Sequence, residues 1–328
     1  MNDTFFDIRS SASRLLKRLI LFCIFANISI FAAYSQQDPQ FSLNKFNQLT
    51  VNPGFAGSSG LINMSMLNRS QWVGFPGAPT TSVFNTDAKV HLIGINDGVG
   101  FSIVSDAIGF EKNVSVGLNY AYRSKLGDGV LGSGLSLGLM NKNLNFALGE
   151  TDGSDLVNQS DQALPKGKAG GIMADVGLGF FYQVGNMEVG FSGKHLNRPS
   201  ITFNESGKYT LTRSYYLNGS YTIHLADERF DAIPSLFYKR DRGSWQADAN
   251  ITIQYNKQYW GSIGYRVGDA LIISGGTELW NGIKCGYAYD MSISALSKYN
   301  AGSHEFFLAY SVLLYKKHKH KYNSVRFL

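Results

Sequence analysis

The sequence predicts an all-β fold, namely a transmembrane antiparallel up-and-down β-barrel of about 14 strands. The first observation is the strict alternation of apolar and polar residues from Trp245 to Tyr255, which gives a strand one apolar and one polar face. The second is that similar segments, close to the roughly 9–11 residues that cross a membrane as a tilted strand, recur along the chain. The third is composition: 36 glycines, 7 prolines and 13% aromatic residues suit closely packed strands with aromatic girdles better than a helical enzyme.

Residues 1–35 have the pattern of a secretory signal peptide. Three basic residues precede the apolar run 19–33, and the stretch from Ala33 to Ser35 is a small-x-small cleavage site. We therefore expect cleavage before Gln36, with an uncleaved anchor helix as the alternative.

The positive charge of the chain is concentrated at its C-terminus. Of the formal net charge of +6, the leader contributes two and residues 316–328 contribute five, so the remainder carries about −1. Nucleic-acid binding needs a basic face on a folded module, and none is evident. Two histidines in the tail, His318 and His320, are a weak metal signal, and an electrostatic contact with an acidic partner is favoured. We expect no cofactor, no metal and, with Cys285 alone after cleavage, no disulfide within the chain.

The barrel is expected within residues 60–315. Its strands are the alternating or β-rich segments between turn signals, and their even number places both ends of the sheet on one side. The expected strands are 61–69, 80–91, 98–106, 112–124, 130–142, 171–184, 187–196, 208–223, 230–240, 244–256, 259–267, 270–278, 282–291 and 304–315.

The connections between these strands sort by length. The short ones, 92–97, 125–129, 185–186, 224–229, 257–258 and 279–281, alternate with connections that include the long loops 143–170, 197–207 and 292–303. Outer-membrane barrels have short periplasmic turns and long outer loops. We therefore expect an outer-membrane protein with its N- and C-termini in the periplasm.

Charged residues fall mostly on one face of the expected strands. A lysine or arginine facing lipid at mid-membrane costs about 2–4 kcal/mol, so the opposite face should be the lumen. The polar residues expected there are Asp87, Lys89, Arg123, Asp175, Glu188, Lys194, Asp248, Asn250, Lys284, Asp290 and Glu305. Because both signs occur in similar numbers, one interpretation is a self-neutralising hydrogen-bonded lumen. The other is a lumen that receives an inserted polypeptide.

Three strands need separate comment. Arg213 shares the apolar face of strand 208–223, which is tolerable if that strand projects beyond the bilayer, and Pro234 weakens the assignment of 230–240. The last strand, from Ser303 to Tyr315, should pair with the first, because an open edge in lipid would leave backbone groups without hydrogen bonds.

Several segments outside the alternation pattern carry a family resemblance. Residues 37–59 read Q-D-P-Q-F-S-L-N-K-F-N-Q-L-T-V-N-P-G-F-A-G-S-S, residues 68–81 read N-R-S-Q-W-V-G-F-P-G-A-P-T-T, and G-S-H-E at 302–305 precedes F-F-L-A-Y. These segments resemble the PorP/SprF family of outer-membrane proteins from Bacteroidetes, from one end of the mature chain to the other. The departures are modest: Gly54 stands where alanine is common, and residues 43–45 replace a glutamine-tyrosine run.

The resemblance implies a role in type IX secretion and gliding-associated export. It implies as partners secreted adhesins or cargo with a matching C-terminal domain, periplasmic secretion lipoproteins and a peptidoglycan-binding protein. The alternative function is a passive porin or small-solute channel. An enzyme is not expected, because no supporting motif surrounds Ser303, His304, Glu305 or Ser311.

Two sets of residues are candidates for partner binding. The first, Trp72, Gly74, Phe75, Gly77 and Pro79, belongs to the first outer loop, which either folds into the barrel mouth or forms a docking patch. The second lies in residues 36–59, a segment that is either a plug at the periplasmic mouth or a tether to periplasmic partners. Its residues are Asn52, Pro53, Phe55 and Gly57.

Overall fold

The structure is a computed structural model that describes residues 38–92, 95–145, 168–203, 207–279 and 282–312. The expected signal peptide, most of the loop 143–170 and the basic tail lie outside the described residues. Within them, no helix is long and apolar enough to cross a membrane.

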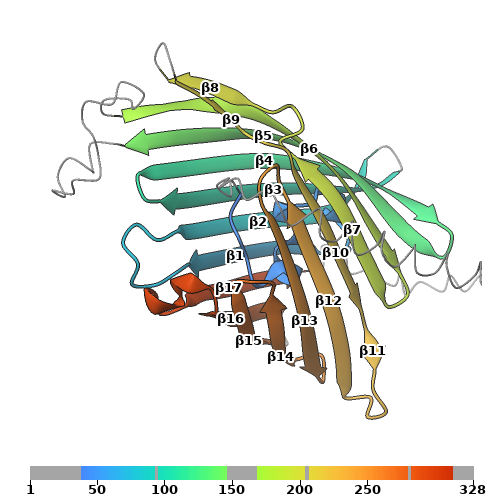
Figure 1. Cartoon of the computed structure of the whole chain (residues 1–328). Coiled ribbons are helices and arrows are strands. Elements are labelled where there is room, and N and C mark those ends of the chain that lie inside the picture. Colours follow the sequence, from blue (N-terminus) through green and yellow to red (C-terminus); the bar gives the residue numbers. More distant parts are fainter. Residues whose placement is uncertain (1–37, 93–94, 146–167, 204–206, 280–281, 313–328) are drawn as a thin grey trace, which may run out of the picture. The chain divides into compact units, whose positions relative to one another are not determined.

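The described residues form a closed antiparallel barrel of fourteen strands, which confirms the predicted fold (Figure 1). Each of the fourteen expected segments overlaps one wall strand, although many strands are longer than expected. The wall strands are β1 (Ile62–Ser70), β2 (Thr80–Leu92), β3 (Ile95–Ile108), β4 (Glu111–Leu126), β5 (Gly129–Asn145), β6 (Lys168–Val184), β7 (Met187–Lys194), β10 (Ser214–Tyr221), β12 (Phe230–Arg240), β13 (Trp245–Tyr255), β14 (Tyr259–Arg266), β15 (Ala270–Glu278), β16 (Ile283–Ser292) and β17 (Ser303–Val312).

The sheet closes through the predicted pairing of the last strand with the first. β1 and β17 pair antiparallel from Ile62 opposite Val312 to Ser70 opposite His304. On the other side of the barrel, β10 pairs with both β7 and β12. Closure joins the first and last strands of the sheet, as a sheet surrounded by lipid requires.

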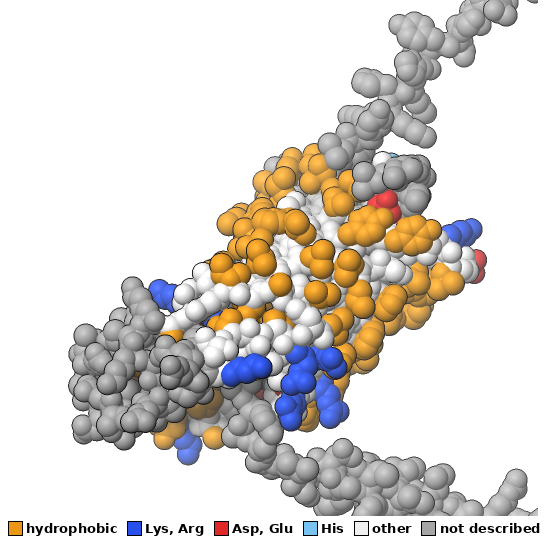
Figure 2. Space-filling view, turned by 90° about the horizontal axis from the view of Figure 1, so that it is seen from above, with side chains coloured by type: hydrophobic (Ala, Val, Ile, Leu, Met, Phe, Trp, Pro, Cys, Tyr) orange, Lys and Arg blue, Asp and Glu red, His pale blue; other side chains and the backbone are white. Residues whose placement is uncertain are grey.

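Side chains alternate between the two faces of the wall. In β13, Trp245 is 57% exposed and Ile251 51% exposed, whereas Gln246 and Asp248 on the other face are buried. Figure 2 shows apolar side chains spread over the visible wall, with charged side chains mostly at its margins. The outer face is therefore suited to lipid, and the inner face to hydrogen bonding.

The expected strand 208–223 is wrong in its first third. Residues before Ser214 belong to a loop hairpin of β8 (Ser200–Phe203) and β9 (Gly207–Thr210), while β11 (Ile223–His224) continues β10 along β12. Arg213 lies outside the wall, and its Nε donates to the carbonyl of Leu196 at 3.0 Å. This position explains why an arginine can share the pattern of apolar residues without facing lipid.

Residues 38–57, which we call the inner segment, cross the lumen from end to end (Figure 1). The side chain of Lys239, near the end of β12, donates a hydrogen bond to the carbonyl of Asp38. The carboxylate of Asp87, near the end of β2, accepts a hydrogen bond from the N–H of Gly57. We call these two ends of the barrel the loop end, where β1 finishes, and the turn end, where β1 begins. The segment contains three short 3₁₀ turns, η1 (Asn44–Phe46), η2 (Gln48–Thr50) and η3 (Pro53–Phe55).

An apolar cluster fixes the middle of the inner segment against the wall. Phe41 and Leu43 pack with Leu67 of β1, Val83 of β2 and Phe307 of β17. The ring of Phe46 lies against those of Phe307 and Trp260, with centroids 4.7 and 4.9 Å away. Burial of each large apolar side chain is worth roughly 1.5–3 kcal/mol, so this cluster holds the segment firmly.

Candidate functional site

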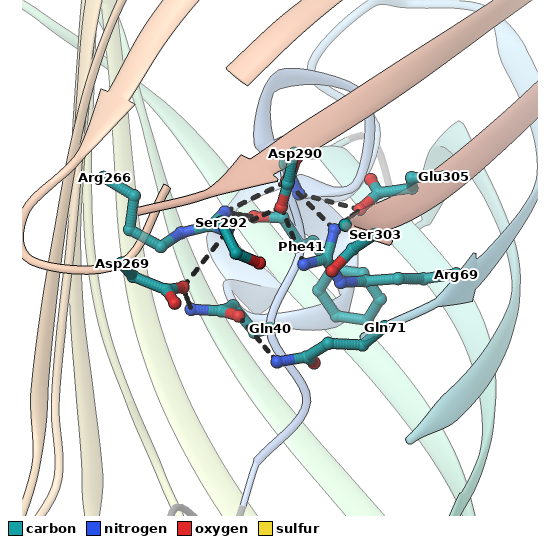
Figure 3. Close-up of polar contacts among 12 residues, drawn as sticks. Gln40, Phe41, Arg69, Gln71, Arg266, Asp269, Asp290, Ser292, Ser303 and Glu305 are labelled. Atoms are coloured by element: carbon teal, nitrogen blue, oxygen red, sulfur yellow. Dashed lines mark hydrogen bonds and ion pairs between the residues drawn. The ribbon is translucent and has the colours of Figure 1, made fainter. Parts of the chain in front are cut away.

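Five charged side chains of the wall form a network at the loop end, which we call the charge network. Arg69 of β1 contacts Asp290 of β16 at 2.7 Å and Glu305 of β17 at 3.0 Å. Arg266 of β14 contacts the same Asp290 at 2.7 Å and Asp248 of β13 at 3.0 Å. All five side chains are at most 2% exposed, and both guanidinium groups are paired. Figure 3 shows Arg69, Arg266, Asp290 and Glu305 of this network.

The charge network holds the inner segment through its main chain. Glu305 accepts hydrogen bonds from the N–H groups of Ser42 and Leu43, each at 2.8 Å. Arg266 Nη2 donates to the carbonyl of Phe41 at 3.0 Å. The Ser42 hydroxyl donates a hydrogen bond to Asp290 at 2.7 Å and accepts one from Arg69 at 3.0 Å.

Three segments that carry the family resemblance meet at this point. Ser42 belongs to D-P-Q-F-S, Arg69 to the tryptophan-containing segment and Glu305 to G-S-H-E. Gln40 extends the contact, since it accepts from Gln71 and donates to Asp269, both at 3.2 Å (Figure 3). Segments far apart in the sequence therefore build one site at the loop end.

A second cluster binds the first residue of the inner segment. His195 lies in the loop after β7, at φ +56°, a conformation that costs energy for a residue other than glycine. Its Nε2 donates to Asp38 at 3.0 Å and its Nδ1 to Asp175 at 2.9 Å. Although burial lowers the pKa of His195, the charge of Asp38 and the hydrogen bonds to both carboxylates raise it to about 9. The imidazolium at neutral pH therefore joins the inner segment to β6.

Tyr216 and Lys239 complete this cluster. The hydroxyl of Tyr216 donates to the Asp38 carboxylate at 2.5 Å, and Lys239 Nζ donates to the Asp38 carbonyl at 2.6 Å. Lys194, expected in the lumen, lies 3.9 Å from the same carboxylate. The loop end thus binds both the side chain and the main chain of Asp38.

At the turn end, close backbone packing adds to the hydrogen bonds that Asp87 and Arg123 make with the segment. Gly54 fits directly against β5 and β6, where an added Cβ would lie 2.7 Å from the Gly132 carbonyl oxygen and 2.9 Å from that of Gly179. An added Cβ on Gly98 of β3 would overlap the carbonyl of Ala56. Glycine is needed on both sides of this contact because no side chain fits between the backbones.

The candidate residues of the second set all lie in this turn-end contact. Asn52 is fully buried; its Nδ2 donates to the Phe180 carbonyl at 2.9 Å, and its Oδ1 accepts from the N–H of Gly54 at 2.9 Å. Pro53 opens η3, and the ring of Phe55 meets that of Phe181 edge-on at 5.1 Å. The N–H of Gly57 donates to Asp87 at 2.8 Å.

The candidate residues of the first set lie at the loop end, apart from the second set. Trp72 has φ +49°, and its N–H donates to Ser303 Oγ at 3.1 Å. The Gly77 and Pro79 carbonyls accept hydrogen bonds from backbone N–H groups at 2.9 Å, while Gly74 and Phe75 face solvent, the latter 41% exposed. The loop is therefore ordered by hydrogen bonds and exposes an aromatic ring.

The remaining candidate lumen residues are distributed along the wall. Asp87 and Arg123 are buried near the turn end, where Arg123 donates to Gln183 at 3.1 Å, and Lys89 in the same strand as Asp87 is exposed. Glu188 accepts a hydrogen bond from Gln183 at 3.1 Å, and Lys284 pairs with Glu278 at 2.9 Å.

Two cavities flank the inner segment. One of about 200 Å³ is lined by Asn250, Lys45 and Trp260 among other residues, and one of about 60 Å³ lies toward β3–β5. The inner segment and its bound side chains occupy much of the space between them.

Several residues of the site were not predicted from the sequence. Arg69, Arg266, His195 and Lys239 make central contacts in the site but were not among the candidates. Of the charge network, only the three carboxylates were candidates. Arg266 could have been found, since it shares an alternating face with Trp260, Ser262 and Gly264. The signal for His195 was misleading, because the expected strand 187–196 places it on the apolar face, whereas β7 ends at Lys194 and His195 lies in the loop.

Metal chemistry has no evident site in the part of the chain that the structure describes. No group of three or more histidine, cysteine or acidic side chains that could hold a metal ion occurs there. His318 and His320 lie outside the described residues.

The chain matches one protein family and is similar in fold to several solved β-barrel structures. The family described as type IX secretion system membrane protein PorP/SprF matches residues 33–310. No curated protein matches the chain.

Solved structures with a similar fold share little sequence. The outer membrane protein Omp33 from Acinetobacter baumannii is 8% identical, with a TM-score of 0.42, over 77% of this chain and 98% of that one. The translocator domain of the autotransporter NalP from Neisseria meningitidis is 13% identical, with a TM-score of 0.40, over 93% and 97%. The monoaromatic hydrocarbon channel CymD is 11% identical, with a TM-score of 0.45, over 81% and 92%.

Proposed function

The chain belongs to the PorP/SprF family of type IX secretion system membrane proteins, and from this premise we propose that it is a non-enzymatic docking component of the secretion machinery. It binds secreted substrates, such as surface adhesins with a matching C-terminal domain, and couples them to periplasmic secretion proteins. The competing function is a passive porin or small-solute channel.

The observation that carries this proposal is the occupied lumen. The inner segment is bonded to the wall at both ends, by Glu305 and Lys239 at the loop end and by Asp87 at the turn end. A passive porin needs a water-filled path through its barrel. A lumen filled by the protein's own chain supports binding over free conduction.

The first loop supports docking at the loop end. Val73 and Phe75 are exposed, although the loop that carries them is tied down by hydrogen bonds from Val73 to Gly302 and from Ala301 to Val73, both at 2.8 Å. An aromatic side chain held in place loses little conformational entropy when a partner covers it. We therefore place a partner contact at Trp72–Pro79.

A deletion strain tests the docking function. We expect loss of the gene to abolish surface display of a cognate adhesin while the outer membrane keeps its barrier to detergents and large antibiotics. Normal display in that strain, with no paralogue to compensate, would overturn the proposal.

Planar-bilayer recording separates docking from conduction. The purified wild-type protein should conduct little when no partner is present, because the inner segment obstructs the lumen. Large, steady single-channel currents from the wild-type protein would instead favour the porin function.

A further inference from the structure

Several hydrogen bonds of the wall go to main-chain groups of the inner segment, which every polypeptide has. At the loop end, Lys239 and Arg266 donate to the carbonyls of Asp38 and Phe41, and Glu305 accepts from two successive N–H groups. Further along, Ser192 Oγ donates to the carbonyl of Val51 at 2.7 Å. Main-chain hydrogen bonds give affinity that does not depend on side-chain identity, as when a peptide adds to a sheet edge.

The two halves of the inner segment are bound by different means. At the turn end, the backbone of Gly54 and Ala56 touches the wall so closely that a side chain in place of a wall glycine would not fit. At the loop end, charged groups and hydrogen bonds bind residues 38–43, and the apolar cluster accommodates the side chains of Phe41 and Leu43. A foreign polypeptide can therefore replace the loop-end half, while the turn-end half stays in place.

Removal of the loop-end half leaves the charge network paired. Arg69 keeps Asp290 and Glu305, and Arg266 keeps Asp248 and Asp290, because all these contacts are within the wall. A buried charge that loses its partner is costly, but none is stranded in this network. Vacating the site therefore strands no charge of the charge network, and Lys239 and His195 lose their contacts with Asp38 only until an incoming segment replaces them.

We propose that the loop-end half of the lumen is a polypeptide-binding site, occupied in this structure by the chain's own residues 38–43. An extended segment of the secreted partner displaces these residues and takes over their bonds to Glu305, Arg266 and Lys239. This inference rests on the proposed docking function and assigns it a location in the lumen.

The surroundings of the resident segment define the chemistry of the incoming one. It carries a carboxylate where Asp38 meets His195 and Tyr216, and an apolar ring where Phe41 lies in its cluster. A small hydroxyl-bearing residue follows, to match Ser42 between the arginines and Asp290. The ligand is therefore an extended acidic and aromatic peptide segment.

A fluorescent peptide copy of residues 36–47 is the probe for this site. Binding to the purified full-length protein is followed by fluorescence anisotropy, for the wild type and for Asp38→Ala. The substitution weakens the resident segment but leaves the wall intact, so we expect the variant to bind the probe at least 10-fold more tightly. Ser42→Ala serves as a second variant of the same kind, and heat-modifiable gel migration verifies that each barrel is folded.

Methylated peptides test whether main-chain groups are recognised. Methylation of the peptide nitrogens that correspond to Ser42 and Leu43 removes both donors to Glu305, and we expect affinity to fall at least 10-fold. Methylation at the Lys45 position, beyond the reach of Glu305, is the control and should change affinity little. Equal effects of the two modifications, or no binding by any folded variant, would overturn the proposal.

The outcome can be separated from that of the proposed function. If the probe fails to bind although the deletion strain loses adhesin display, the lumen site is wrong and docking occurs elsewhere. If the probe binds but display is normal in the deletion strain, the lumen binds peptides and the proposed function is wrong.

Discussion

Arg69 and Arg266 pair with the carboxylates of the charge network. Each guanidinium lies between two carboxylates, and Asp290 is common to both. A buried ion pair adds little net stability compared with apolar packing, but the loss of one partner is strongly destabilising. Single substitutions in the charge network should therefore have large effects.

Glu305→Gln should loosen the loop-end half of the inner segment. The variant loses the charge beside Arg69 and leaves one amide oxygen to accept from two N–H groups. We expect a cost of about 2–4 kcal/mol, visible as faster hydrogen exchange at the Ser42 and Leu43 amides.

The matched control for this substitution is Glu278→Gln. Glu278 pairs with Lys284 at 2.9 Å, but both side chains are about one-third exposed. Its loss should cost less than about 1 kcal/mol. Similar effects of the two substitutions on exchange would contradict the assigned role of Glu305.

The contact between His195 and Asp38 should depend on pH. The pKa of His195 is raised from 6.5 to about 9, so its stabilising contribution is fully present below pH 6.5 and is lost as pH rises through 9. We expect residues 38–41 to become more susceptible to limited proteolysis between pH 7 and pH 10. His195→Gln should abolish this pH dependence. If the change in proteolysis with pH persists in that variant, a group other than His195 is responsible.

At the scale of elements, each end of the inner segment matches the strands it meets. The segment brings Phe41, Leu43 and Phe46 to a part of the lumen where β1, β2 and β17 expose apolar residues inward. At the turn end it brings Asn52 and Gly54 to a part of β5 and β6 where the wall has glycines. The inward-facing residues of these wall strands therefore match the inner segment, while their outward-facing residues match lipid.

Gly98→Ala should displace the turn-end half of the inner segment. The added methyl group would overlap the carbonyl of Ala56, and neither backbone can move without breaking hydrogen bonds. We expect easier proteolytic cleavage within residues 52–57 and a higher conductance in planar bilayers.

The matched control for Gly98→Ala is Gly219→Ala in β10. An added Cβ there would meet only the carbonyl of Glu188, at an ordinary contact distance of 3.7 Å. Its conductance and its cleavage pattern should match those of the wild type. A Gly98→Ala protein that behaves like this control would show that the turn-end contact is looser than described.

At the scale of the whole molecule, the barrel and the inner segment are separable. The strands close on themselves through the ladder between β1 and β17 and that between β10 and β12, without help from residues 38–57. The backbone hydrogen bonds that lipid demands are thus satisfied within the wall.

A protein that lacks residues 38–57 should still form a barrel, with a more open lumen. We expect heat-modifiable migration on gels as for the wild type, and a conductance at least several-fold higher. Loss of heat-modifiable migration would mean that the inner segment is required for closure.

The strand pattern was predictable because it is local. Alternation along β13, for example, follows from the pleat of a strand between lipid and a polar interior. It can be recognised within the strand itself, without knowledge of the rest of the chain. Even the error at 208–223 arose locally, since β9 alternates as a wall strand does but pairs with β8 in the loop. The polar face could be found in the same way, which is why three carboxylates of the charge network were among the candidates.

The sequence by itself determined the number of wall strands, their lipid-facing sides, the closing pair and the family. It left open whether the inward polar residues line a water-filled channel, bind a partner or pair with one another. All three functions produce the same alternation of apolar and polar residues along a strand. Only the tertiary structure decided that Arg69, Arg266 and Glu305 meet around Ser42, and that Gly54 touches the wall. Those residues come from strands far apart in the chain, and their distances exist only once the barrel has closed around the inner segment.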